Sequence, residues 1–154
     1  MIQPLSIGLF IDGGYYEKID EALRHNSGLG LDLKKLMHFI RTTVAEHYDT
    51  TIDECQIVES HYFRGRYRAA VAEQKRILFP ERRFEDALIE NDVIFHYKHL
   101  REIDGTIIEK GIDVWYALEA YELATVRHFD VVVLITGDAD HEMLIRKLKA
   151  LKSN

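Results

Sequence analysis

The 154-residue chain contains little cysteine, little proline and no long apolar run, and each shortage excludes a class of proteins. Its single cysteine, Cys55, can form neither an internal disulfide nor a thiolate cluster for zinc, which favours a reducing, cytoplasmic location. The longest apolar stretches, such as 131–135, fall far short of the about 20 residues of a membrane-spanning helix. The N-terminus also lacks the basic and apolar regions of a signal peptide. We therefore expect a cytoplasmic protein with no membrane partner.

Positive charge is also scarce over the chain as a whole. The formal net charge is −6, so overall charge does not favour binding to nucleic acid. The exception is the stretch 64–83, in which seven basic residues stand against two glutamates. The sequence therefore predicts an acidic protein with one basic segment.

Hydrophobic spacing predicts one domain, 1–154, in which strands and helices alternate. Strands are expected at 5–11, 55–63, 93–97 and 131–136, and helices at 15–24, 32–48, from 67 until Pro80 interrupts, after 111–113, and near the C-terminus. Asp104-Gly105 suits the turn of a small β-hairpin arm at 100–109. This alternation is typical of a doubly wound α/β fold with a mainly parallel sheet and helices on both faces. No strand follows the last helix, which leaves open whether a C-terminal edge strand is missing and the domain truncated.

Four aspartates lie where the predicted strands and helices meet. Asp12 and Asp138 follow the first and last strands, Asp140 lies two residues further on, and Asp113 lies at the start of a helix. Ligands bind at the carboxyl ends of parallel strands, and clustered carboxylates need a cation to offset their repulsion. Oxygen ligands suit Mg²⁺ or Mn²⁺, which can activate water against a phosphodiester. The alternatives are helix capping for Asp113 and Asp140 and a turn role for Asp138.

Arginines and aromatic residues alternate after the second predicted strand. Arg64, Arg66 and Arg68 lie among Tyr62, Phe63 and Tyr67 in a combination that can bind phosphates and stack on unpaired bases. The alternative is a solvated helix start with inward-facing tyrosines. The same surface could also include Tyr97, Lys98, His99, Arg101 and Lys110. His141 is either a general acid or a residue of a helix start, and the second interpretation is favoured.

Three segments resemble the signature segments of NYN domains, which belong to the PIN-like nuclease superfamily. They are Phe-Ile-Asp-Gly-Gly at 10–14, Lys-Gly-Ile-Asp-Val at 110–114 and Leu-Ile-Thr-Gly-Asp-Ala-Asp at 134–140. The resemblance implies a metal-dependent endoribonuclease with its acidic metal-binding positions at Asp12, Asp113, Asp138 and Asp140. Thr136 and Lys110 match the hydroxyl residue and the lysine of the family.

The sequence departs from the family pattern at two positions near the aspartates. Tyr15 stands where many members have asparagine, and His141 stands where an aromatic residue is common. Glu119 falls where many members have another aspartate, and its role stays open.

The first functional hypothesis is a ribonuclease that uses Mg²⁺ or Mn²⁺ against single-stranded RNA. The second is a catalytically weak RNA-binding or protein-interaction module on the same fold. A small-molecule phosphohydrolase is disfavoured, because the segment after Asp12 lacks the second aspartate of an aspartyl-phosphate mechanism. Homodimer formation stays open.

Overall fold

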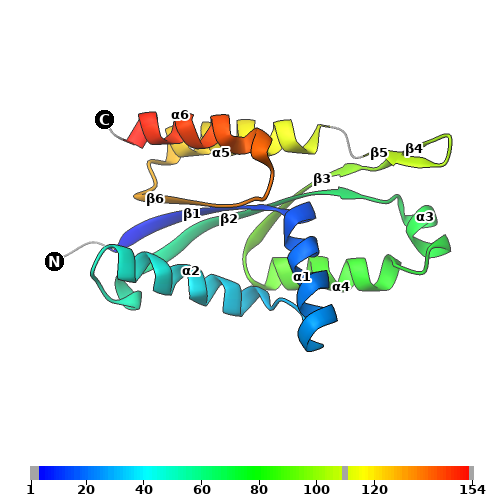
Figure 1. The fold of residues 1–154 in the computed structure, drawn as a ribbon, viewed down its shortest axis with the longest axis horizontal. Helices are drawn as coiled ribbons and strands as arrows, with labels where there is room; N and C mark the ends of the chain where they lie inside the picture. Colours follow the sequence, from blue (N-terminus) through cyan, green and yellow to red (C-terminus); the bar gives the residue numbers. More distant parts are fainter. Residues whose placement is uncertain (1–3, 109–110, 153–154) are drawn as a thin grey trace.

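A four-stranded parallel sheet forms the centre of the protein (Figure 1). The computed structural model describes residues 4–108 and 111–152. The strand order is β3-β2-β1-β6, and all three neighbouring pairs are parallel. The strands are β1 (Leu5–Asp12), β2 (Cys55–Arg66), β3 (Val93–His99) and β6 (Val131–Ile135). The predicted α/β class and parallel sheet are confirmed.

Helices cover both faces of this sheet (Figure 1). One face carries α1 (Gly13–Ser27), α2 (Leu33–His47) and α4 (Leu78–Glu90), and the other carries α5 (Ile112–Arg127) and α6 (Glu142–Lys152). The short elements are η1 (Ile52–Glu54), α3 (Ala69–Gln74) and η2 (Ala139–His141). In the described part of the chain, no helix combines the length and apolar character that crossing a membrane requires.

The predicted hairpin arm is confirmed as β4 (Arg101–Ile103) and β5 (Thr106–Ile108), which pair antiparallel. Asp104 and Gly105 both have positive φ, as a tight two-residue turn requires. The arm extends past the carboxyl end of β3, beyond the edge of the main sheet (Figure 1).

The hydrophobic core has two layers, one on each face of the sheet. Ile7, Leu9 and Ile11 of β1 pack in the layer that includes α1, α2 and α4. Phe10 faces the other layer, where Tyr116 of α5 is buried. Because β1 is a central strand, it is apolar on both faces, which explains its nearly continuous hydrophobic run.

The sequence prediction was wrong about Pro80 and about the end of the second strand. Pro80 does not interrupt a helix; it lies in the first turn of α4, where its missing N–H has no intrahelical acceptor to lose. The break comes earlier, between α3 and α4, where Arg76 has a φ of 59°. In addition, β2 continues to Arg66, so Arg64 and Arg66 are strand residues.

Gly13 permits the close approach of α1 to the end of β2. A Cβ atom at this position would lie 2.7 Å from the Phe63 carbonyl oxygen and 2.7 Å from the Tyr62 ring. At the next position, Gly14, the nearest atom to such a Cβ would be at an ordinary 3.4 Å. Gly13 therefore fixes where α1 begins, and with it the position of Asp12 just before the helix.

Candidate metal centre

Asp12 and Asp138 lie at the same edge of the sheet. Their strands are parallel neighbours, with Ile11 opposite Ile135. Asp12 is the N-cap of α1 and accepts a 3.0 Å hydrogen bond from the Gly14 N–H through Oδ1. Asp138 is the N-cap of η2 and accepts a 2.9 Å hydrogen bond from the Asp140 N–H through Oδ1. Each carboxylate thus combines capping with a place at the carboxyl end of a strand.

Asp113 brings a third carboxylate to this edge. It lies in the first turn of α5, whose N-cap is Gly111, so the capping alternative for Asp113 was wrong. Burial raises the pKa of Asp113, and the negative charges of Asp138 and Asp12 and a hydrogen bond with Asp138 raise it further. Ligand atoms of Asp113, Asp138 and His141 lie within 4.8 Å of one another. A raised carboxyl pKa among like charges indicates a site that a cation would stabilise.

Thr136 and His141 connect the two sides of this acidic cluster. The Asp138 N–H donates to Thr136 Oγ1 at 3.2 Å, and Thr136 Oγ1 lies 2.6 Å from His141 Nδ1. His141 Nε2 lies 3.2 Å from the Asp113 carbonyl oxygen, which can only accept a hydrogen bond. A neutral His141 ring therefore carries its proton on Nε2, and its Nδ1 accepts from the Thr136 hydroxyl. Both ring nitrogens are occupied, so the carboxylates are the donors best suited to a metal.

The role of His141 was underestimated from the sequence. The residue is only 2% exposed and stacks on Tyr116 with a centroid separation of 4.7 Å. It does belong to the short helix η2, as the favoured interpretation expected. Its second function, holding the start of α5 against the β6–η2 loop, depends on a residue 28 positions away, and no local pattern signals it.

Two of the acidic residues considered from the sequence, Asp140 and Glu119, lie outside the close group of ligand atoms. Asp140 is exposed in η2 and lies outside the close group formed by Asp113, Asp138 and His141. Its capping alternative was wrong, because Asp138 caps η2. The charge of Glu119 acts on His96 of β3 and raises its pKa, although burial and the charge of His61 lower the pKa of His96 overall.

Tyr15 lies against the loop that carries Asp138. A Cβ atom at Gly137 would lie 2.5 Å from the Tyr15 ring, so a side chain there would have to displace this ring. The tyrosine that departs from the family pattern thus forms part of the site and packs on the loop next to Asp138.

The three predicted arginines separate into two regions. Arg64 forms an ion pair with Glu17, and Arg66 pairs with Glu85 at 3.0 Å, both beside α1 and α4. Arg68 instead lines a cavity of about 720 Å³ at the end of β3 and the hairpin arm. The other residues that line this cavity, called the basic cavity below, include Tyr97, Lys98, His99, Arg101 and Gly111. Lys110 lies outside the described residues.

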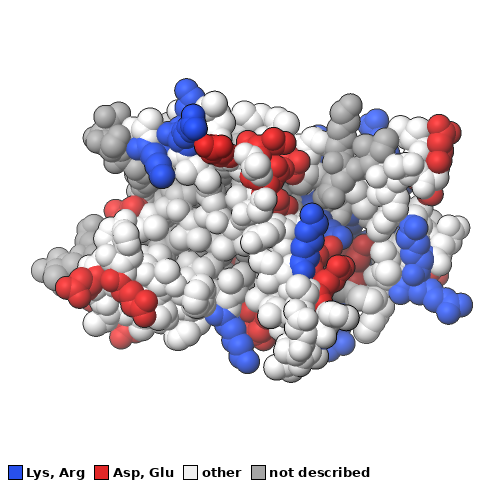
Figure 2. Space-filling model, viewed as in Figure 1, with Lys and Arg blue, Asp and Glu red and all other residues white. Residues whose placement is uncertain are grey.

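Charged side chains of both signs are spread unevenly over the face of the molecule that Figure 2 shows. Acidic side chains gather where β6 leads into α6, and Lys and Arg side chains lie over α1 and α3. Because Gly111 lines the basic cavity and lies two residues from Asp113, this cavity reaches the start of α5 next to the acidic cluster.

A central parallel sheet flanked by helices, with carboxylates at its carboxyl edge, is consistent with a PIN-like fold. The family model that matches the chain is the NYN domain, over residues 6–154. The protein therefore belongs to the NYN domain family, whose members are generally nucleases. No curated protein and no solved structure matches the chain.

We predict that the Thr136 hydroxyl is required to hold the β6–η2 loop. Thr136→Val should lower the free energy of unfolding by about 1–3 kcal/mol, because the buried His141 nitrogen and the Asp138 N–H both lose their partner. Thr136→Ser keeps the hydroxyl and should cost less than half as much. Urea unfolding of both variants checks this, and equal stability losses would contradict the hydrogen-bonded role.

Proposed function

We propose that this protein is a metal-dependent endoribonuclease. The observation that carries the proposal is geometric: ligand atoms of Asp113 and Asp138 lie within 4.8 Å of each other, and Asp12 follows the strand next to β6. Three carboxylates from three different elements meet at the carboxyl edge of the sheet, and oxygen donors of this kind fit Mg²⁺ or Mn²⁺. Membership of the NYN family supports hydrolysis of a nucleic acid.

Asp12, Asp113 and Asp138 would hold the metal, and Asp140 would contribute from the exposed side of the loop. The bound ion supplies a Lewis acid that polarises a phosphoryl oxygen and lowers the pKa of water. Thr136 and His141 position the Asp138 loop against the start of α5. The cap bonds of Asp12 and Asp138 fix both carboxylates before any ligand arrives, which reduces the reorganisation needed for binding.

The basic cavity supports single-stranded RNA as the substrate. Arg68, Lys98 and Arg101 offer positive charge along a path that ends beside α5, and Tyr97 offers an aromatic surface. Unpaired RNA combines phosphates with exposed bases, and such a surface can bind both. We place this reaction in the cytoplasm, in keeping with the buried, unpaired thiol of Cys55.

A substrate comparison tests this proposal. We expect internal cleavage of an unstructured, end-labelled RNA oligomer in Mn²⁺, and no release of phosphate from free nucleotides. The same RNA annealed to its complement should be cleaved at least about tenfold more slowly, because its bases are no longer exposed. Salt-sensitive RNA binding without turnover would contradict the enzyme proposal and support a binding module.

A further inference from the structure

A separate cavity of about 550 Å³ lies between α1 and α4, on the face of the sheet opposite α5. Its apolar lining includes Tyr16 of α1, Phe84 and Ile77 from the α4 side, and Phe95 of β3. The Tyr16 and Phe84 rings lie in contact, with centroids 5.6 Å apart. The volume and the aromatic part of the lining are in the range of a small-molecule site.

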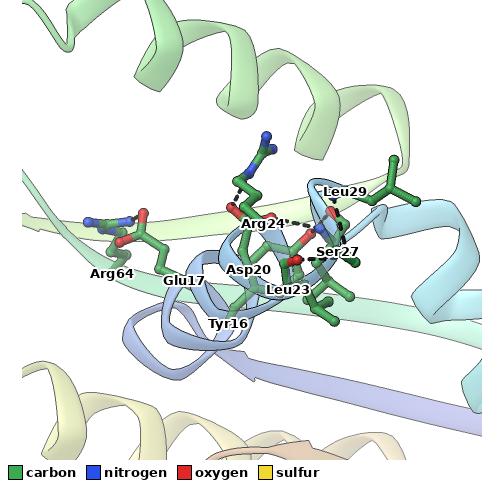
Figure 3. Close-up of polar contacts among 9 residues, drawn as sticks. Tyr16, Glu17, Asp20, Leu23, Arg24, Ser27, Leu29 and Arg64 are labelled. Atoms are coloured by element: carbon green, nitrogen blue, oxygen red, sulfur yellow. Dashed lines mark hydrogen bonds and ion pairs between the residues drawn. The ribbon is translucent and has the colours of Figure 1, made fainter.

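The charged residues of this cavity do not favour a phosphate. Arg64 of β2 pairs with Glu17 of α1, and Arg24 pairs with Asp20 at 3.0 Å within α1 (Figure 3). Arg66 pairs with Glu85. Glu81 is a fourth acidic residue in the lining, so acids outnumber arginines. A neutral group that presents N–H donors therefore fits this lining better than a phosphate does.

Two buried polar atoms, both in residues that line the cavity, have no hydrogen-bond partner among the described residues. They are Glu81 Oε1, an acceptor, and Arg66 Nε, a donor, and both are buried. A buried polar atom without a partner is costly, and a ligand that carries N–H donors beside a carbonyl oxygen offers a partner of the right kind to each. Guanine has this pattern, because its N1–H and N2–H groups can face a carboxylate while O6 accepts from an arginine. No other RNA base offers two adjacent N–H donors to a carboxylate.

The wall of the cavity includes the end of β2, the strand that neighbours Asp12. Arg64 in its wall directly follows Phe63, which pairs with Asp12 on the neighbouring strand. Adjacent strands are about 4.8 Å apart. A base in the cavity can therefore belong to a nucleotide close to a phosphodiester that is held at Asp12.

We propose that the cavity between α1 and α4 binds an unpaired guanine base of the RNA, next to the bond that is cleaved. This proposal rests on the proposed ribonuclease function, because it assigns the base to the substrate. Glu81 and Arg66 read the edge of the base, and Tyr16, Phe84 and Phe95 surround its plane.

Calorimetric titration of the full chain in EDTA tests base recognition without turnover. Guanosine 5′-monophosphate should bind about tenfold more tightly than adenosine 5′-monophosphate, with inosine 5′-monophosphate, which lacks the N2 amino group, between them. The pentaribonucleotide UUGUU should bind more tightly than guanosine monophosphate and about tenfold more tightly than UUAUU. Equal affinities for the three mononucleotides would overturn the proposal. Binding of guanosine monophosphate but not of UUGUU would also overturn it, by showing a site for free nucleotides.

Glu81→Gln should remove the preference for guanine, because the carboxylate no longer accepts two N–H groups. Glu90→Gln is the matched control, since Glu90 is exposed at the end of the same helix, and it should keep the full preference. Circular dichroism checks that both variants are folded; if Glu81→Gln does not fold, the guanine and inosine affinities of the unmodified protein decide. A preference retained in folded Glu81→Gln would overturn the assignment.

The two proposals fail in different ways. A protein that prefers guanine in EDTA but cleaves no RNA in Mn²⁺ would contradict the ribonuclease proposal, and with it the assignment of the base to a cleaved substrate. A protein that cleaves RNA but binds all bases equally would contradict the cavity proposal alone.

Discussion

Replacement of Asp138 by asparagine should slow RNA cleavage by about a hundredfold or more, because the site loses one of its converging carboxylates. The fold should persist. An asparagine side chain can still accept the hydrogen bond from the Asp140 N–H, so the cap of η2 is kept. Initial rates on a single-stranded RNA oligomer, with circular dichroism of the same preparation, measure both effects.

The same substitution should leave the metal-free protein as stable as before or more stable. The pKa of Asp113 is raised in the folded state, so ionising Asp113 opposes folding, and stability falls as the pH rises from the ordinary aspartate range through this raised pKa. Removing the charge of Asp138 removes part of the repulsion that raises the pKa of Asp113. Urea unfolding in EDTA should therefore show a smaller loss of stability between acid and neutral pH in Asp138→Asn than in the unmodified protein.

Asp53→Asn is the matched control for this variant. Asp53 is exposed in η1, which precedes the first residue of β2 and so lies at the opposite edge of the sheet from the acidic cluster. Its substitution should change neither the cleavage rate nor the pH dependence of stability. Undiminished cleavage by Asp138→Asn, or a rate loss matched in Asp53→Asn, would contradict the proposed metal centre.

Removal of divalent metal is expected to abolish cleavage and to lower the thermal stability of the protein. A cation that binds only the folded state stabilises it by about 2.7 kcal/mol at a concentration one hundred times its Kd. Additions of Mn²⁺ or Mg²⁺ after EDTA should therefore restore the rate and raise Tm. Differential scanning calorimetry and cleavage assays on the same samples make the comparison.

The rise in Tm should depend on the acidic cluster. Asp113→Asn and Asp138→Asn should each remove most of it, whereas Asp53→Asn should show the full rise. Potassium chloride of matched ionic strength controls for general screening by salt. Cleavage that continues unchanged in EDTA, or a Tm rise that persists in both cluster variants, would exclude a catalytic metal at these carboxylates.

Much of the backbone could be predicted from the sequence, because its signals are local. The apolar runs at 5–11 and 131–136 predicted two strands, and Asp104-Gly105 predicted the hairpin turn. Local signals were misleading at Pro80, since a proline suits the first turn of a helix as well as its end.

The position of the acidic cluster could also be anticipated, because it follows from the topology of a parallel sheet. In a parallel sheet, residues that directly follow neighbouring strands meet at one edge whatever their distance in sequence, so Asp12 and Asp138 were placed by topology. The hydrogen bonds that position each carboxylate could not be predicted from the sequence. The chain from the Asp138 N–H through Thr136 to His141 and on to Asp113 depends on how α5 packs over the sheet.

The sequence by itself determined the order of strands and helices and the residues at their ends, because hydrophobic period, turn residues and caps act over a few positions. Only the tertiary structure decided which side chains meet. Arg64, Arg66 and Arg68 alternate along one segment, yet the first two pair with Glu17 and Glu85 while the third lines the basic cavity near α5. Their partners come from distant segments, and strand register and helix packing set those distances.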